Sequence, residues 1–190
     1  MLALVSSTDP RWVDVALSNL DAVMLDHLHC ELKAASNAMA LVTRYAYHPR
    51  LVRELSELAR EELTHVQQVH EELARRGLTA RPPDEDPYAK ALRRATDDRL
   101  GEPLLDRLTV ASIIEARSCE RFQILSQHAP TEALRAWYFD LFTSEARHYR
   151  LFASLAEELF GDERARVRIA TLAEREAEIV AKCPLVPRVH

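Results

Sequence analysis

Several residue types are scarce in this sequence, and each shortage excludes a class of protein. Only 3 of the 190 residues are glycine, and no stretch alternates polar and apolar residues as a half-buried strand does, so helices are favoured. The 3 cysteines form no Cys-x-x-Cys pair, which argues against a disulfide framework and a zinc ribbon. No apolar run approaches the roughly 20 residues that a membrane-spanning helix needs, and residues 1–10 do not resemble a signal peptide. We therefore expect a helical protein of the reducing cytoplasm with no membrane association.

The length and composition predict one domain. A chain of 190 residues, of which 47% are hydrophobic, can bury a sizeable core. We expect residues 1–190 to fold as a single unit.

Prolines and glycines divide the chain into helices, because proline is favoured in the first turn of a helix and glycine just after its end. This punctuation predicts four long helices, over about 21–46, about 49–76, about 103 to the turn near 130, and about 130–160. Short helices are expected near 10–20 and 88–97, and a final helix over about 163–182. Residues 78–87 are polar and proline-rich, as the crossover between two helical hairpins of a ferritin-like bundle would be.

One arrangement of acidic residues and histidines occurs twice. Glu31 precedes the pair Glu62 and His65 by about 30 residues, and Glu115 precedes the pair Glu145 and His148 in the same way. Each pair is a Glu-x-x-His, and three residues along an α-helix amount to about 300° of rotation, so its two side chains share a face. Four carboxylates and two imidazoles are the ligand set of a carboxylate-bridged two-metal centre inside a four-helix bundle.

The spacing agrees with two antiparallel hairpins. Glu31 and the first Glu-x-x-His reach the same height only if the turn lies midway, near residues 47–48, and Pro49 follows that point. The midpoint of the second set falls at residues 130–131, where Pro130 stands. One Glu-x-x-His would be expected by composition alone; two copies with matched partners argue against the alternative of solvated acids and ordinary core histidines.

The ligand types predict the metal and leave some neighbours open. Carboxylates with imidazoles suit iron or manganese, and two reduced irons could activate O2. His27, four residues before Glu31, is either a partner of that ligand or a hydrogen-bonded core histidine. Tyr138 is expected to pack in the core rather than act in redox chemistry, and Cys119 to behave as a small apolar residue.

The segments around the ligands resemble one family. The run Ile113-Ile114-Glu115-Ala116-Arg117-Ser118-Cys119-Glu120-Arg121-Phe122, together with residues 144–149 and 61–65, closely resembles the bacterial tRNA isopentenyl-adenosine hydroxylases. These are ferritin-like, non-haem di-iron monooxygenases that act on 2-methylthio-N6-isopentenyladenosine at position 37 of tRNA. The resemblance extends over about residues 10–182.

The resemblance implies a fold, a cofactor and partners. The fold would be an all-α, ferritin-like four-helix bundle with additional short helices, and the cofactor would be two iron ions with O2 as co-substrate. By position, the metal ligands fall on Glu31, Glu62, His65, Glu115, Glu145 and His148. The partners would be the anticodon loop of tRNA and an external electron donor, a ferredoxin with its reductase. A ferritin- or rubrerythrin-like protein that handles iron or consumes peroxide would use the same ligands, so this alternative stays open.

The charge distribution neither requires nor excludes RNA binding. The net charge of −5 does not favour a nucleic-acid partner, yet only 3 of the 25 basic residues are lysine, and arginine pairs well with phosphate. Arginines cluster at Arg75, Arg76 and Arg81, at Arg93, Arg94 and Arg99, and at Arg164, Arg166 and Arg168. Each cluster could contact an RNA arm or could simply solvate a helix face.

Overall fold

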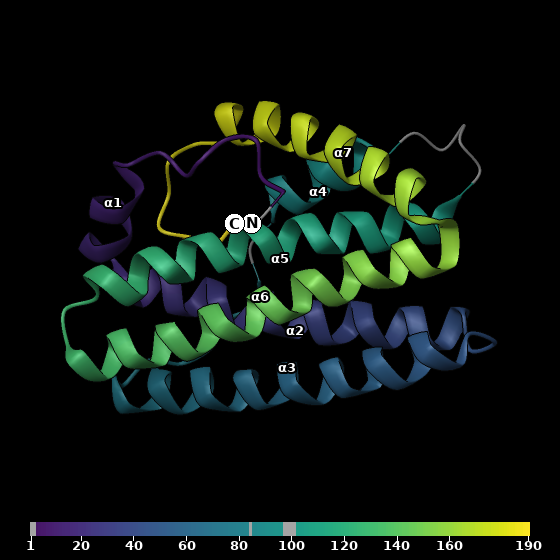
Figure 1. Ribbon diagram of the computed structural model, residues 1–190. Coiled ribbons are helices and arrows are strands. Elements are labelled where there is room, and N and C mark those ends of the chain that lie inside the picture. The colour runs from purple at the N-terminus through teal and green to yellow at the C-terminus, as the bar shows by residue number, and fades with distance from the viewer. Residues whose placement is uncertain (1–2, 84, 97–101) are drawn as a thin grey trace. The chain divides into compact units, whose positions relative to one another are not determined.

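The computed structural model describes residues 3–83, 85–96 and 102–190. Within these ranges the chain forms helices and no strand (Figure 1), which confirms the all-α class. The helices are α1 (Trp12–Ser18), α2 (Leu20–Arg44), α3 (Pro49–Arg75), α4 (Pro87–Arg94), α5 (Pro103–His128), α6 (Glu132–Phe160) and α7 (Asp162–Lys182).

Local chemistry explains most helix boundaries. Pro49, Pro87 and Pro103 each open a helix, because the fixed φ of proline suits the first turn and its missing N–H is not needed there. Gly77 and Gly161 follow the ends of α3 and α6 with φ of 69° and 88°, a region that only glycine enters without strain.

The expected start of α6 at Pro130 is wrong by two residues. The helix begins at Glu132 because the Thr131 side chain accepts a hydrogen bond from the Leu134 N–H and caps the first turn. Pro130 lies before that cap, in the turn itself.

The chain divides into two compact units. The first comprises residues 1–17, 85–186 and 190, and the second comprises residues 18–84 and 187–189. We call them the α5–α6 unit and the α2–α3 unit after their long helical hairpins. In the α2–α3 unit the two helices run antiparallel (Figure 1), and their buried side chains include Val23, Leu41, Leu55 and Val69.

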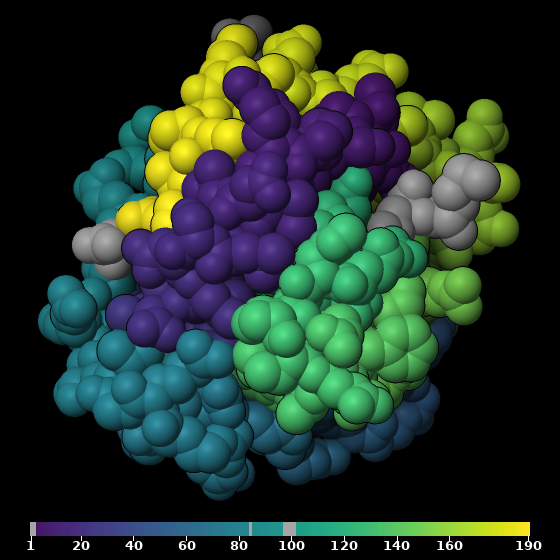
Figure 2. Space-filling view, turned by 90° about the vertical axis from the view of Figure 1, so that its left-hand side faces the viewer, coloured from purple at the N-terminus to yellow at the C-terminus, as the bar shows by residue number. Residues whose placement is uncertain are grey.

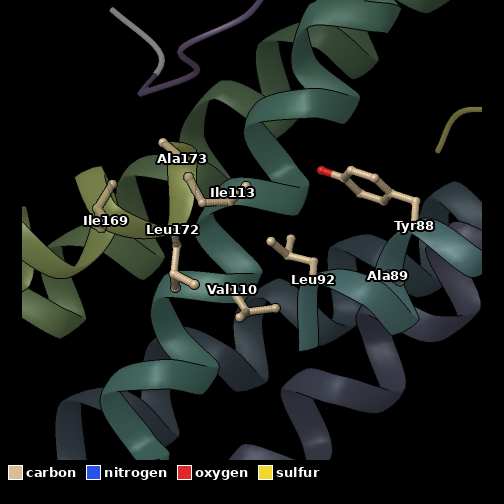
Figure 3. Close-up of a cluster of buried hydrophobic side chains, with 8 residues drawn as sticks. All are labelled: Tyr88, Ala89, Leu92, Val110, Ile113, Ile169, Leu172 and Ala173. Carbon is tan, nitrogen blue, oxygen red and sulfur yellow. The ribbon is translucent and has the colours of Figure 1, made fainter. Parts of the chain in front are cut away.

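In the α5–α6 unit, α4 and α7 cover one face of α5. Figure 3 shows Leu92 of α4 beside Val110 and Ile113 of α5 and Leu172 of α7. These side chains are almost fully buried, and burying one such side chain stabilises the folded state by about 1.5–3 kcal/mol. The other face of α5 is therefore free to carry the polar residues that concern function.

A buried arginine also ties this unit together. The guanidinium of Arg117, which has no exposed surface, donates to both carboxylate oxygens of Glu176 in α7 at 2.8 and 2.9 Å, and to Glu120 at 2.5 Å. It also donates to the carbonyl oxygen of Ser6, and Thr8 donates its backbone N–H to Glu120. The N-terminal segment is thereby held near α5 and α7, and Figure 2 shows it in purple alongside the yellow α7.

We predict that Glu176→Ala destabilises the protein by about 3–5 kcal/mol, because it leaves the buried guanidinium of Arg117 without its main counter-charge. Urea unfolding monitored by circular dichroism measures the change. The control is Glu174→Ala, which replaces an exposed glutamate two residues before Glu176 on the same helix. It should change stability by no more than about 0.5 kcal/mol. Equal effects of the two substitutions would contradict the role assigned to Glu176.

Candidate metal centre

The α2–α3 unit brings three of the expected ligands together at the middle of its hairpin. Glu31 comes from α2, and Glu62 and His65 come from α3. One ligand atom of each residue lies within 4.8 Å of the others. The Nδ1 atom of His65 is 3.2 Å from Oε2 of Glu62 and 3.5 Å from Oε2 of Glu31. We call these three residues the first half-site.

The electrostatics of the first half-site favour positive charge. Burial by itself lowers the pKa of the His65 imidazole, but hydrogen bonds to Glu31 and Glu62 and the charges of both carboxylates outweigh it and raise the pKa to about 10. The two buried carboxylates that stabilise the protonated imidazole would stabilise a metal cation in the same way.

The α5–α6 unit contains an equivalent arrangement, which we call the second half-site. Glu115 of α5 and Glu145 and His148 of α6 each offer a ligand atom within 4.8 Å of the others. The Nδ1 atom of His148 lies 3.7 Å from Oε2 of Glu145. In both half-sites, therefore, the histidine turns Nδ1 toward the glutamate of its own Glu-x-x-His.

The residues of both half-sites fit metal ions. None of the six residues is more than 6% exposed, and an ionised carboxylate is strongly disfavoured in the interior unless a cation or hydrogen bonds compensate it. The Oε2 atom of Glu145 is buried and accepts no hydrogen bond from the residues that the structure describes. Oxygen and imidazole donors without a thiolate suit iron or manganese rather than structural zinc.

His27 supports the first half-site directly. Its Nε2 lies 2.5 Å from Oε1 of Glu31, and its side chain has no exposed surface. His27 therefore contacts the carboxylate of Glu31 through the oxygen other than the one near His65. Partners of this kind orient a ligand and tune its basicity.

Two other neighbours have structural roles. Burial, with the charges of Glu145 and Glu120, raises the pKa of the Cys119 thiol to about 12, so the thiol is protonated at neutral pH. Tyr138 is fully buried and packs against Phe122 with ring centroids 5.8 Å apart. Both results agree with the expectation of core packing.

The arginine clusters divide into neutralised and exposed members. Arg75 and Arg76 pair with Glu72, and Arg164 pairs with Glu102. Arg168 is buried against Asp106, with Nε 2.6 Å from the carboxylate. Arg168 therefore forms an ion pair in the core and does not offer its charge to RNA.

Arg81 and Arg166 of these two clusters are exposed, and so are the described arginines of the middle cluster. Arg93 and Arg94 end α4 and are exposed. Arg99 lies outside the described residues.

Comparison with known proteins identifies a family that matches almost the whole chain. The model of the tRNA-(MS2IO6A)-hydroxylase (MiaE) family matches residues 2–190. A protein of Pseudomonas putida is 43% identical over 174 residues, which cover 90% of this chain and 82% of the relative. A protein of Salmonella typhimurium is 30% identical over 226 aligned residues, covering 93% of this chain and 80% of the relative. Both relatives are named tRNA 2-(methylsulfanyl)-N(6)-isopentenyladenosine(37) hydroxylase.

A solved structure gives the fold. A Synechococcus protein described as having aldehyde deformylating oxygenase activity matches with a TM-score of 0.93 and 37% identity, covering 100% of this chain and 96% of that one. The fold is therefore ferritin-like, as the duplicated ligand pattern predicts. No helix in the described part of the chain is long and apolar enough to cross a membrane.

We predict that His148→Ala loses most of its bound iron, because it removes one of the few neutral donors while the nearby buried carboxylates remain. Iron per chain after loading, measured by inductively coupled plasma mass spectrometry, checks this. His128→Ala removes an exposed histidine at the end of α5 and should keep the wild-type iron content. A folded His148→Ala protein with full iron would remove His148 from the ligand set.

Proposed function

We propose a function from the fact that the chain belongs to the tRNA-(MS2IO6A)-hydroxylase (MiaE) family. The protein would hydroxylate the isopentenyl group of 2-methylthio-N6-isopentenyladenosine at position 37 of tRNA. The observation that carries this proposal is the family match over residues 2–190, found in a chain that has all six expected ligands in two buried half-sites. The tRNA substrate would place the enzyme in the cytoplasm.

The two half-sites would act together as one di-iron centre within a single domain of residues 1–190. Their matched composition supports this pairing, since each supplies two glutamates and one histidine. The ferritin-like fold supports it too, because such bundles build their metal sites from ligands on facing helices. When bound, the two irons would supply the O2 reduction needed to oxidise an unactivated allylic carbon, which acid–base side chains alone cannot do.

The residues of the chain have defined tasks around that chemistry. Glu31, Glu62, Glu115 and Glu145 would provide the negative charge that holds the cations, and His65 and His148 the neutral donors. His27, through its 2.5 Å contact with Glu31, would keep one ligand oriented and offers a proton-carrying group beside it. The six residues are almost fully buried, so they would exclude water from bound irons and limit side reactions.

The overall reaction needs electrons from outside. One atom of O2 enters a C–H bond of the prenyl group to give the alcohol, and the other leaves as water, which consumes two electrons and two protons. The sequence has no glycine-rich nucleotide loop and no Cys-x-x-Cys, so the chain itself has no recognisable site for a redox cofactor other than the metals. The family resemblance suggests a ferredoxin and its reductase as the donor.

The structural relative favours oxygen chemistry over iron storage. Its description names an oxygenase activity, and it is similar to this chain over its whole length. Substrate binding would then have two parts, in which arginines contact phosphates while an apolar pocket admits the prenyl group.

We predict that the reduced, iron-loaded enzyme transfers one atom of isotopically labelled O2 into the prenyl group of substrate tRNA. Mass spectrometry of the digested nucleosides measures the label. The control is the same reaction with labelled water and unlabelled O2, which should give no label. Consumption of peroxide or mineralisation of iron with unchanged tRNA would support the ferritin- or rubrerythrin-like alternative instead.

We also predict that tRNA affinity falls as salt rises, because arginines that bind phosphates release counterions. Replacing Arg93 and Arg94 together by Gln should weaken binding and lower the salt dependence by about one unit of slope per lost phosphate contact. Fluorescence anisotropy at several salt concentrations measures both, with iron content as the control for an intact site. Unchanged binding would remove these two residues from the interface and leave the family assignment intact.

A further inference from the structure

The chain contains one long stretch without acidic residues. Between Glu31 and Glu54 the basic residues are Lys33, Arg44, Arg50 and Arg53, and no Asp or Glu occurs. The chain as a whole has a net charge of −5, so this concentration of positive charge is unusual for the molecule. Arg44, Arg50 and Arg53 lie where α2 turns into α3. We call residues 44–53 the hairpin tip.

The hairpin tip also exposes an aromatic ring that the fold does not use. Tyr47 is 71% exposed, whereas Tyr45, two residues earlier, is buried. The Tyr47 ring lies 4.6 Å from the His48 ring and meets the edge of Tyr45 at 6.3 Å. The turn is held by hydrogen bonds from the Tyr45 N–H to Leu41 and from the His48 N–H to Tyr45. The backbone is therefore hydrogen-bonded on both sides of the exposed ring, and an ordered backbone lowers the entropy that binding would cost.

Arginines outnumber carboxylates around this ring. Arg44 is exposed, sits over the Tyr45 ring at 5.9 Å and has no carboxylate partner among the described residues. Arg50 and Arg53 both approach one carboxylate, that of Glu54, at 3.9 and 3.0 Å. Residues 44–54 contain three arginines and one glutamate, so the tip carries a net positive charge, and arginine pairs well with phosphate.

We propose that the hairpin tip is a binding surface for the RNA substrate, in which Tyr47 and His48 stack on an unpaired base while Arg44, Arg50 and Arg53 contact phosphates. This inference rests on the proposed function. Single-stranded RNA loops are recognised by stacking of splayed bases on aromatic rings together with arginine contacts to the backbone. The tip combines both elements in one turn of the chain.

The position of the tip favours RNA over an electron donor as its partner. His65 lies sixteen residues from Pro49 along α3, which is roughly 24 Å at about 1.5 Å per residue. Electron tunnelling falls steeply with distance, so a redox partner should dock closer to the metal ligands than this. An RNA arm is many nucleotides long, so it can bind the tip at one point while its target nucleotide reaches the metal ligands.

The test is the affinity of full-length, iron-loaded variants for fluorescently labelled prenylated tRNA, measured by anisotropy. Tyr47→Ala should weaken binding about tenfold, since loss of one base–aromatic stack costs about 1–3 kcal/mol. Tyr47→Phe, which keeps the ring, should bind nearly as well as the wild type. Arg44→Gln should lower the salt slope by about one unit.

Two matched substitutions control for loss of surface area and of charge. Phe139→Ala removes another exposed aromatic ring, on α6, and Arg166→Gln removes an exposed arginine on α7. Neither should change tRNA affinity. Iron content and the unfolding midpoint should stay at wild-type values in the tip variants, because their side chains are exposed and distant from the ligands.

The outcomes separate this inference from the proposed function. If the wild type hydroxylates tRNA and Tyr47→Ala binds it equally tightly, the hairpin-tip assignment is wrong and the function stands. If Tyr47→Ala binds tRNA normally but turns over slowly with ferredoxin and normally with a chemical reductant, the tip serves the electron donor and the RNA assignment is overturned. If the wild type neither binds nor hydroxylates prenylated tRNA, the proposed function itself fails.

Discussion

Burial of carboxylates in the middle of long helices is the constraint on which the rest of this structure depends. Each hairpin places two glutamates and one histidine in its interior, where an uncompensated negative charge is strongly unfavourable. A bound cation removes that penalty, and the high pKa of His65 shows how strongly one of these sites attracts positive charge. In each hairpin the turn between the two helices allows two carboxylates and one imidazole to lie within 4.8 Å of one another.

Opposite faces of helix α5 carry a residue of the second half-site and a residue that holds the α5–α6 unit together. Glu115 and Arg117 are two residues apart, which is about 200° around a helix, so they lie on nearly opposite faces. Glu115 belongs to the second half-site, whereas Arg117 binds Glu176 and the N-terminal segment. The ion pairs and hydrogen bonds of Arg117 anchor α7 and residues 6–8 to the opposite face of the helix that carries Glu115. A rigid support of this kind would keep the Glu115 carboxylate in place.

The sequence was sufficient for the helices and for the residues of each half-site, because helical periodicity, proline and glycine positions and residue spacing are local properties. It did not reveal that Arg168 pairs with Asp106 or that Glu176 neutralises Arg117, since these partners are 62 and 59 residues apart and no local pattern couples them. Pro130 was assigned to the first turn of α6, but the side-chain cap of Thr131 moved the start. The hairpin tip had a sequence signal, the acid-free stretch, but only the structure shows that Tyr47 is exposed and Tyr45 buried.

The most direct test of the central claim, that the two half-sites form one di-iron centre, is anomalous diffraction at the iron edge from crystals of the iron-loaded protein. The account predicts two iron peaks about 3.5–4 Å apart, one bound by His65 and the other by His148, with glutamates from both hairpins around them. A single iron, or two irons each confined to one hairpin and too far apart to share a carboxylate, would contradict it.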